Sequence, residues 1–172
     1  MCSSDLAHRT QCILLRYFNP VGAHPSALIG ELPLGRPSNL VPAITQTAIG
    51  KLPKLTVFGK DYPTRDGSCV RDFIHVCDIA HAHTLALQFL LQGRSKKRCE
   101  VFNLGTGKGV TVLEAIQAFE AVSGQALNYE IGPRRPGDVV AIYANNEHAI
   151  NTLGWSIQYS LDRKSTRLNS SH

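Results

Sequence analysis

The sequence predicts an α/β fold, because short apolar runs typical of strands alternate with longer segments that carry helix-capping residues. The clearest apolar runs are Cys12–Phe18, Leu55–Phe58 and Cys99–Leu104. The 172 residues amount to roughly one domain. No apolar run approaches the ~18 residues that a membrane-spanning helix needs.

The first half of the chain is expected to hold two strands and one helix. Cys12–Phe18 forms the first strand, and a stretch rich in proline and glycine follows at 19–38. Asn39 then opens a helix whose natural stop is Gly50, since glycine readily adopts the conformation that ends a helix. Leu55–Phe58 is the second strand.

The middle of the chain repeats this alternation. The FIHV stretch at 73–76 is interpreted as a strand that leads into a helix. Asp78 is the candidate N-cap of that helix, which should end near Gly93. Cys99–Leu104 is expected to be a buried strand.

Two further helices are expected toward the end of the chain. Thr111 and Glu114 stand three residues apart, which matches a capping box, and Gly124 follows the last turn. Asn145 is the expected cap of the last helix, with Gly154 as its terminator.

The two ends of the sequence resemble translated sequencing adaptors. Cys2–Leu6 can be encoded by a DNA word whose reverse complement, in another frame, encodes Asp162–Ser165. We therefore expect residues 1–6 and 162–172 to be non-native, and residues 7–161 to be the native part. Asp162 itself can belong either to the native part or to the adaptor-like tail.

Charge and cysteine content narrow the class of protein. The net charge of +5 is mild and scattered, and no run of lysine and arginine indicates a nucleic acid or a membrane surface as partner. The cysteines show no CxxC spacing and lie in apolar contexts, which favours thiols in the cytoplasm over disulfides. We expect a cytoplasmic protein.

The segment Cys69–His83 concentrates chemically active residues: three histidines, two cysteines and two aspartates. A zinc site is not expected there, because His81 and His83 are two apart on a predicted helix and face different sides. Its histidines and cysteines are interpreted as structural. Arg71 stands at the entrance of a strand, where it is either part of a scaffold ion pair or a contact for an anion.

Six segments in order carry a family resemblance: LLRYFNPVGAHPSALIGE, SNLVP, LTVFGKDYPTRDG, VRDFIHVCDIAHAH, FNLGTGKGVTVLE and RRPGDV. Together they resemble the C-terminal half of the UDP-glucose 4-epimerases, within the extended short-chain dehydrogenase/reductase superfamily. The resemblance implies the C-terminal part of a Rossmann-like doubly wound parallel sheet, with a smaller substrate-binding lobe. The Asn-Pro-Val-Gly at 19–22 favours an epimerase over related dehydratases and decarboxylases.

The resemblance also implies roles for single residues at the cofactor and the sugar. Tyr17 and Phe18 would line the nicotinamide end of an NAD pocket. Asn19 would donate a hydrogen bond to the sugar-phosphate. Ile142 would border the position of the sugar's N-acetyl group, and its intermediate volume implies a partial preference for sugars without that group.

The remaining implied contacts concern the nucleotide. Asn39 and the backbone of Leu40 would contact the diphosphate, and Arg71 and Arg135 would clamp it from two sides. The family's usual second asparagine is replaced by Ser38, which puts a contact there in doubt. The base would be held by Thr56, Val57 and Phe58, and Asp138 would accept from the ribose hydroxyls.

By this resemblance the chain is part of an NAD-dependent isomerase that interconverts UDP-galactose and UDP-glucose through a 4-keto sugar. The sequence contains neither the glycine fingerprint of an NAD site nor a Tyr-x-x-x-Lys pair, so we expect it to be inactive alone. The intact parent enzyme is expected to be a homodimer. Two alternatives stay open: a non-catalytic nucleotide-sugar-binding module, and a related NAD-dependent sugar epimerase or dehydratase.

Overall fold

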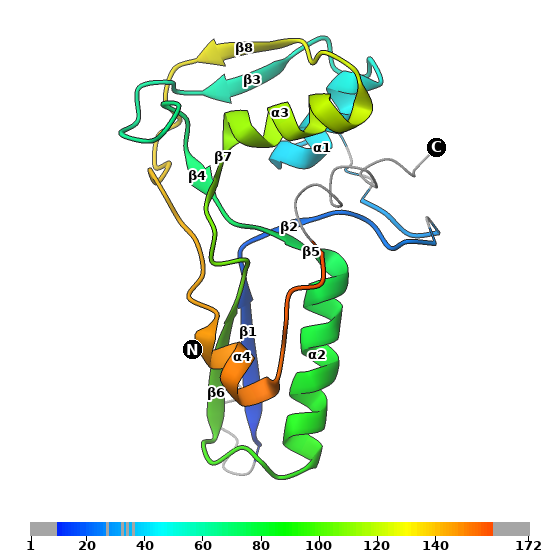
Figure 1. Cartoon of the computed structure of the whole chain (residues 1–172), viewed down its shortest axis with the longest axis vertical. Helices are drawn as coiled ribbons and strands as arrows, with labels where there is room; N and C mark the ends of the chain where they lie inside the picture. Colours follow the sequence, from blue (N-terminus) through cyan, green and yellow to red (C-terminus); the bar gives the residue numbers. More distant parts are fainter. Residues whose placement is uncertain (1–9, 27, 32, 34, 36, 160–172) are drawn as a thin grey trace.

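The computed structural model of the chain describes residues 10–26, 28–31, 33, 35 and 37–159. The expected adaptor-like ends therefore lie outside the described residues. Within them, the chain forms two lobes stacked along the long axis of the molecule (Figure 1). Short strands connect the lobes. None of the described helices is both long and apolar enough to cross a bilayer.

The first lobe is built on a parallel strand pair. Strand β1 (Cys12–Tyr17) pairs with β6 (Cys99–Leu104), in a register that runs from Cys12 opposite Cys99 to Tyr17 opposite Leu104. One face of the pair is covered by α2 (Val76–Leu91) and α4 (Glu147–Leu153) (Figure 1). The parallel sheet that the family resemblance implies is confirmed for these two segments.

The core of this lobe forms where alternate β6 residues meet the two helices. Phe102 and Leu104 are fully buried, as their alternation with half-buried neighbours requires of a strand covered on one face. Trp155, which follows α4, is also buried in this cluster. Its indole N–H donates to the carbonyl oxygen of Asp78 at 2.9 Å, so the ring's polar atom is satisfied inside the core.

The second lobe places two helices against another parallel strand pair. Strand β3 (Leu55–Phe58) pairs with β8 (Tyr129–Gly132), and α1 (Leu40–Ala48) and α3 (Val112–Ser123) pack below them (Figure 1). Their shared core consists of Ile44, Leu55, Val57, Leu113, Ile116, Phe119 and Leu127. This lobe thus combines the region 40–58 with α3 and β8.

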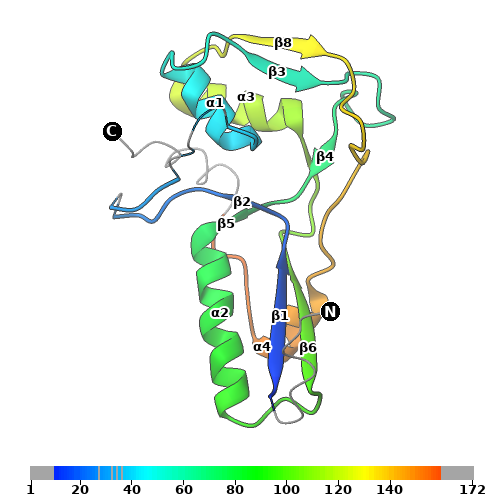
Figure 2. The same cartoon turned by 180° about the vertical axis from the view of Figure 1, so that it is seen from behind.

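Two short strand pairs connect the lobes. Strand β2 (Asn19–Val21) runs parallel to β5 (Phe73–His75), directly before α2. Strand β4 (Val70–Arg71) runs antiparallel to β7 (Val110–Thr111), directly before α3. The view from behind shows β2 and β5 between the two lobes, and β4 running from the second lobe toward them (Figure 2).

Helix ends follow the predicted caps in part. The capping box is confirmed: Thr111 accepts from the amide of Glu114, and Glu114 accepts from the amide of Thr111. Gly124 and Gly154 take the left-handed conformation, with φ of 67° and 70°. The predicted helix from Asn39 is also present, but the Asn39 side chain makes no capping bond within it.

Two predicted caps are wrong. Helix α2 begins at Val76, and its N-cap is His75, whose Nδ1 accepts from the amide of Cys77 at 3.1 Å. Asp78 lies inside the first turn and is buried, because its carboxylate accepts from the amides of residues 158 and 159. At α4 the N-cap is Asn146 rather than Asn145. Asn145 still contributes, since its Oδ1 accepts from the amide of Glu147.

Candidate functional site

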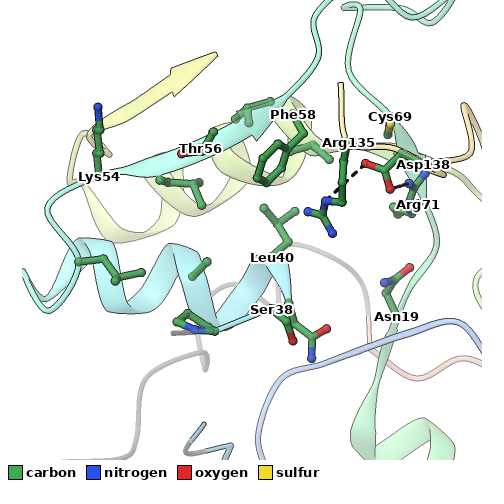
Figure 3. Close-up of a pocket in the computed structure, with 17 residues that line it drawn as sticks. Asn19, Ser38, Leu40, Lys54, Thr56, Phe58, Cys69, Arg71, Arg135 and Asp138 are labelled. Carbon is green, nitrogen blue, oxygen red and sulfur yellow. Dashed lines mark hydrogen bonds and ion pairs between the residues drawn. The ribbon is translucent and has the colours of Figure 1, made fainter. Parts of the chain in front are cut away.

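A cavity of about 570 Å³ lies between the second lobe and the connecting strands. It is lined by β3, the start of α1, the β4 strand and the segment after β8 (Figure 3). Ten of the residues named from the sequence line it: Asn19, Ser38, Asn39, Leu40, Thr56, Val57, Phe58, Arg71, Arg135 and Asp138. These residues come from distant parts of the chain, and the structure brings them together at one cavity.

Arg71 and Asp138 form the most buried ion pair of the cavity. Arg71 Nη2 donates to Asp138 Oδ1 at 3.2 Å, and the two side chains are only 16% and 20% exposed. Arg71 Nη1 also donates to the carbonyl oxygens of Val70 and Val139, each at 2.8 Å. A guanidinium carries five N–H donors, and these bonds use three. Arg71 is thus a scaffold residue and a wall of the cavity, with donor capacity to spare for an anion.

Arg135 approaches the same carboxylate from the opposite side. Its Nε is 3.9 Å from Asp138 Oδ2, and its side chain is half exposed. Its guanidinium carbon lies over the ring of Phe58, 4.5 Å from the centroid, which is a cation–π contact (Figure 3). Two guanidinium groups therefore face one carboxylate, and this excess of positive charge favours an anionic ligand.

The start of α1 contributes a second feature suited to anions. Ser38, Asn39 and Leu40 line the cavity where the helix begins, and the first amides of a helix carry a partial positive charge. Asn39 has an extended backbone, and its side-chain amide reaches Glu31 Oε1 at 3.5 Å. Ser38, where the resemblance implies an asparagine, also lines the cavity.

Seven of the lining residues were not named as site residues from the sequence, and Lys54 and Cys69 are the two with chemically active side chains. Lys54 precedes β3 and pairs with Glu130 at 2.5 Å; the hydrogen bond from Lys54 lowers the pKa of Glu130. Cys69 is buried beside Arg71. Lys54 could have been found as the charged residue at the entrance of the LTVF strand. A thiol in an apolar context gives no such signal.

Three predicted residues lie outside the lining of this cavity. Tyr17 and Phe18 stand at the carboxyl end of β1 and just beyond it, where ligands of parallel sheets bind. Tyr17 is 48% exposed, so its ring is accessible to a ligand. Ile142 is 40% exposed, and its amide donates to Val70 at 3.1 Å.

Two histidines of the histidine- and cysteine-rich segment make local contacts in α2. His75 is buried as the cap of α2, and His83 Nδ1 lies 2.9 Å from the carbonyl oxygen of Ile79 one turn back. Among the described residues, no three side chains of metal-binding type converge. Cys69 and Arg71 are the members of this segment that line the cavity.

Residues 3–105 match the model of the NAD dependent epimerase/dehydratase family. Over 150 residues the chain is 54% identical to a bifunctional UDP-glucose 4-epimerase and UDP-xylose 4-epimerase from Arabidopsis thaliana. The match covers 87% of this chain and 42% of that relative. The chain therefore spans less than half of the relative's length.

Solved structures agree with this match. A UDP-glucose 4-epimerase from Stenotrophomonas maltophila, with bound NAD and formylated UDP-arabinopyranose, is 53% identical and superposes with a TM-score of 0.88. It matches 92% of this chain, which covers 46% of that structure. A UDP-glucose 4-epimerase from Bifidobacterium longum in complex with NAD⁺ and UDP is 45% identical, with a TM-score of 0.86 and the same coverage.

Proposed function

We propose that this chain, which belongs to the NAD dependent epimerase/dehydratase family, supplies the nucleotide-sugar-binding part of a UDP-glucose 4-epimerase. The observation that carries the proposal is the placement of Asp138 between Arg71 and Arg135 in one cavity. Two fixed cations beside a carboxylate suit a ligand with both phosphates and hydroxyl groups. A UDP-sugar has both.

The nucleotide has a matching position for each of its parts. The Phe58 ring and the neighbouring backbone of Thr56 and Val57 would hold the uracil. Arg71 and Arg135 would each bind a phosphate, since a guanidinium offers the parallel donors that phosphate oxygens accept. Asp138 would then accept from the ribose hydroxyls.

The sugar and the near phosphate would meet the other side of the cavity. Asn39 and the Leu40 amide at the start of α1 would face the diphosphate. Asn19 would donate to the sugar-phosphate. Ser38 has a hydroxyl but a shorter reach than an asparagine, so we assign it at most a weak contact. Ile142 would border the sugar ring and set the preference among substrates.

NAD would bind at the carboxyl end of β1. The exposed Tyr17 ring is a suitable apolar surface for a nicotinamide, and Phe18 continues it. NAD supplies the group that accepts and returns the hydride of the sugar. The chain's own contribution is to orient the UDP-sugar, because its sequence has no Tyr-x-x-x-Lys pair and no glycine fingerprint.

The proposal makes a direct statement about activity. The chain alone should not convert UDP-galactose to UDP-glucose in a coupled assay. The same chain joined to the N-terminal half of the Arabidopsis relative should do so. Turnover by the isolated chain, or a chimera that binds NAD and UDP without turnover, would contradict it.

The chimera also separates the alternatives. A substrate panel with UDP-glucose, UDP-xylose and UDP-glucuronic acid distinguishes a 4-epimerase of neutral sugars from a related epimerase or dehydratase. A non-catalytic module would bind UDP and leave every substrate unchanged. We also propose that the intact enzyme is a homodimer and that it is located in the cytoplasm. Sedimentation of the chimera tests whether it forms a dimer.

A further inference from the structure

Asp72 is a fully buried carboxylate directly after Arg71. Its Oδ1 accepts from the amide and the hydroxyl of Thr106, at 2.8 and 2.6 Å. Its Oδ2 accepts from the amides of Gly107 and Ala144, at 3.1 and 3.0 Å. Four donors thus converge on one buried side chain, so both of its oxygens have hydrogen-bond partners inside the protein.

These bonds tie together segments that are far apart in the sequence. Thr106 and Gly107 lie in the loop after β6, and Ala144 lies between Asp138 and α4. The backbone oxygen of Asp72 also accepts from the amide of Asn19 at 2.9 Å. Asp72 therefore connects a wall of the cavity at Asn19 with the segment that follows Asp138.

The packing around this carboxylate is close. A Cβ atom at Gly105 would lie 2.4 Å from Asp72 Oδ2 and 2.6 Å from the Ala144 Cβ, so this position accepts no side chain without displacement. Beside it, the Val70 strand is held to the same segment by two bonds, from the Val70 amide to Val140 and from the Ile142 amide to Val70. The Asp72 carboxylate is the polar centre of this junction.

A buried carboxylate has an unfavourable desolvation energy, and an apolar residue could fill the same space. Within the described part of the chain, no lysine, arginine or histidine forms an ion pair with Asp72. Its geometry instead fixes three backbone donors and one hydroxyl at defined positions. Such a group specifies how segments meet more than it stabilises them.

We propose that Asp72 is a positioning residue for the UDP-sugar site: it sets the distance between Arg71 and Asp138. The inference rests on the proposed function, because it concerns the same cavity. Arg71 is held through its neighbour Asp72, and Asp138 through the segment that ends at Ala144. If this junction loosens, the chain keeps both the Arg71 guanidinium and the Asp138 carboxylate, but the distance between them increases.

Asp72→Asn tests this with little change in volume. One carboxylate oxygen becomes an NH₂ group that faces N–H donors, so two bonds are replaced by repulsion. UDP binding to the folded chain, measured by calorimetry, should weaken about tenfold. In an Arg71→Ala background the same change should have little further effect, because Asp72 acts through Arg71.

Asp78→Asn is the matched control. Asp78 is also buried and also accepts two backbone amides, but it lies in α2 away from the cavity. The Asp78→Asn substitution should lower the free energy of unfolding and leave UDP affinity unchanged. Thr106→Val, which removes one donor, should weaken UDP binding several-fold, and Thr106→Ser should restore it. This pair keeps the test available if Asp72→Asn does not fold.

Each outcome separates the two proposals. A wild-type chain that does not bind UDP overturns the proposed function. A wild-type chain that binds UDP, with Asp72→Asn or Thr106→Val of equal affinity, overturns the positioning role alone. Amide hydrogen exchange gives a readout that does not depend on UDP: Gly107 and Ala144 should exchange faster in Asp72→Asn, and unchanged rates would also refute the role.

Discussion

The guanidinium of Arg135 lies over the ring of Phe58, with 4.5 Å between its central carbon and the ring centroid (Figure 3). The contact joins β3 to the segment after β8. The arginine covers a face of the Phe58 ring, the ring that we propose as a contact for the uracil base. Arg135 is also near Asp138. A bound UDP would therefore exchange two intramolecular contacts of Arg135 for contacts with the ligand.

Phe58→Leu should separate base binding from phosphate binding. A stacked aromatic ring contributes roughly 1–3 kcal/mol per base, so UDP affinity should fall about tenfold. Pyrophosphate affinity should fall much less, since leucine keeps both arginines and removes only the cation–π contact of Arg135. Arg135→Ala should weaken both ligands. Calorimetric titration with the two ligands checks this, and equal losses for UDP and pyrophosphate in Phe58→Leu would refute the base assignment.

Arg71→Ala should have the largest effect on UDP binding. It removes one phosphate contact and leaves the mostly buried Asp138 with a single, more distant cation. Truncating one partner of such a pair costs about 2 kcal/mol or more, which is ~30-fold in affinity. Arg71→Lys keeps the charge but not the forked geometry of the guanidinium, so its UDP affinity should lie between those of the wild type and Arg71→Ala. A lysine variant as weak as the alanine variant would mean that geometry alone matters.

Acid should destabilise the second lobe through Glu114. The hydrogen bond from Arg65 holds the pKa of Glu114 below its usual 4.5, against the effect of burial. A carboxyl with a lowered pKa stabilises the fold above the unfolded pKa, and the contribution is lost as pH falls through the folded pKa. The free energy of unfolding in urea should therefore be steady near neutral pH and fall below about pH 4.5.

Glu114→Gln is the control for this pH dependence. Glutamine can keep the capping bond to the Thr111 amide, but it has no charge for Arg65. The variant should show a shallower loss of stability in acid. A residual slope is expected from Asp66: burial raises its pKa, but hydrogen bonds from Thr111 and Ser68 outweigh this and lower it. An unchanged slope in Glu114→Gln would rule out the Arg65 pair as its origin.

Ile142 is expected to influence the choice of sugar in the chimera with the N-terminal half of the relative. Its side chain is 40% exposed in this chain. A change of a few methylenes in a pocket is worth about 1–3 kcal/mol, so discrimination should be partial. The ratio of kcat/KM for UDP-glucose and UDP-N-acetylglucosamine should rise in Ile142→Tyr and fall in Ile142→Ala. If neither variant alters the ratio, Ile142 does not control selectivity.

The long elements could be predicted from the sequence because their signals are local. Cys12–Phe18 and Cys99–Leu104 are apolar runs, and Thr111 with Glu114 is a capping box. Strand β5 was also predicted, from the apolar FIHV stretch, but the other strands of two or three residues are too short to show a period. Strand β8 at Tyr129–Gly132 is largely exposed, so it lacks the apolar alternation of a half-buried strand.

The errors arose where distant residues decide the local structure. Asp78 has the chemistry of an N-cap, but the amides of residues 158 and 159 fold back onto it. Arg71 could not be assigned to an ion pair or to a ligand site from its neighbours, because its partner is 67 positions away. The part played by Asp72 depends likewise on Thr106 and Ala144, so no local pattern marks it.

The titration of the wild-type chain with UDP tests the central claim most directly. The account predicts one binding site per chain, weakened by added salt because two arginines contact the diphosphate. Uridine, which has the base and ribose but no phosphate, should bind far more weakly. A chain that is folded by circular dichroism and releases no heat with UDP, or that binds uridine and UDP equally, would contradict it.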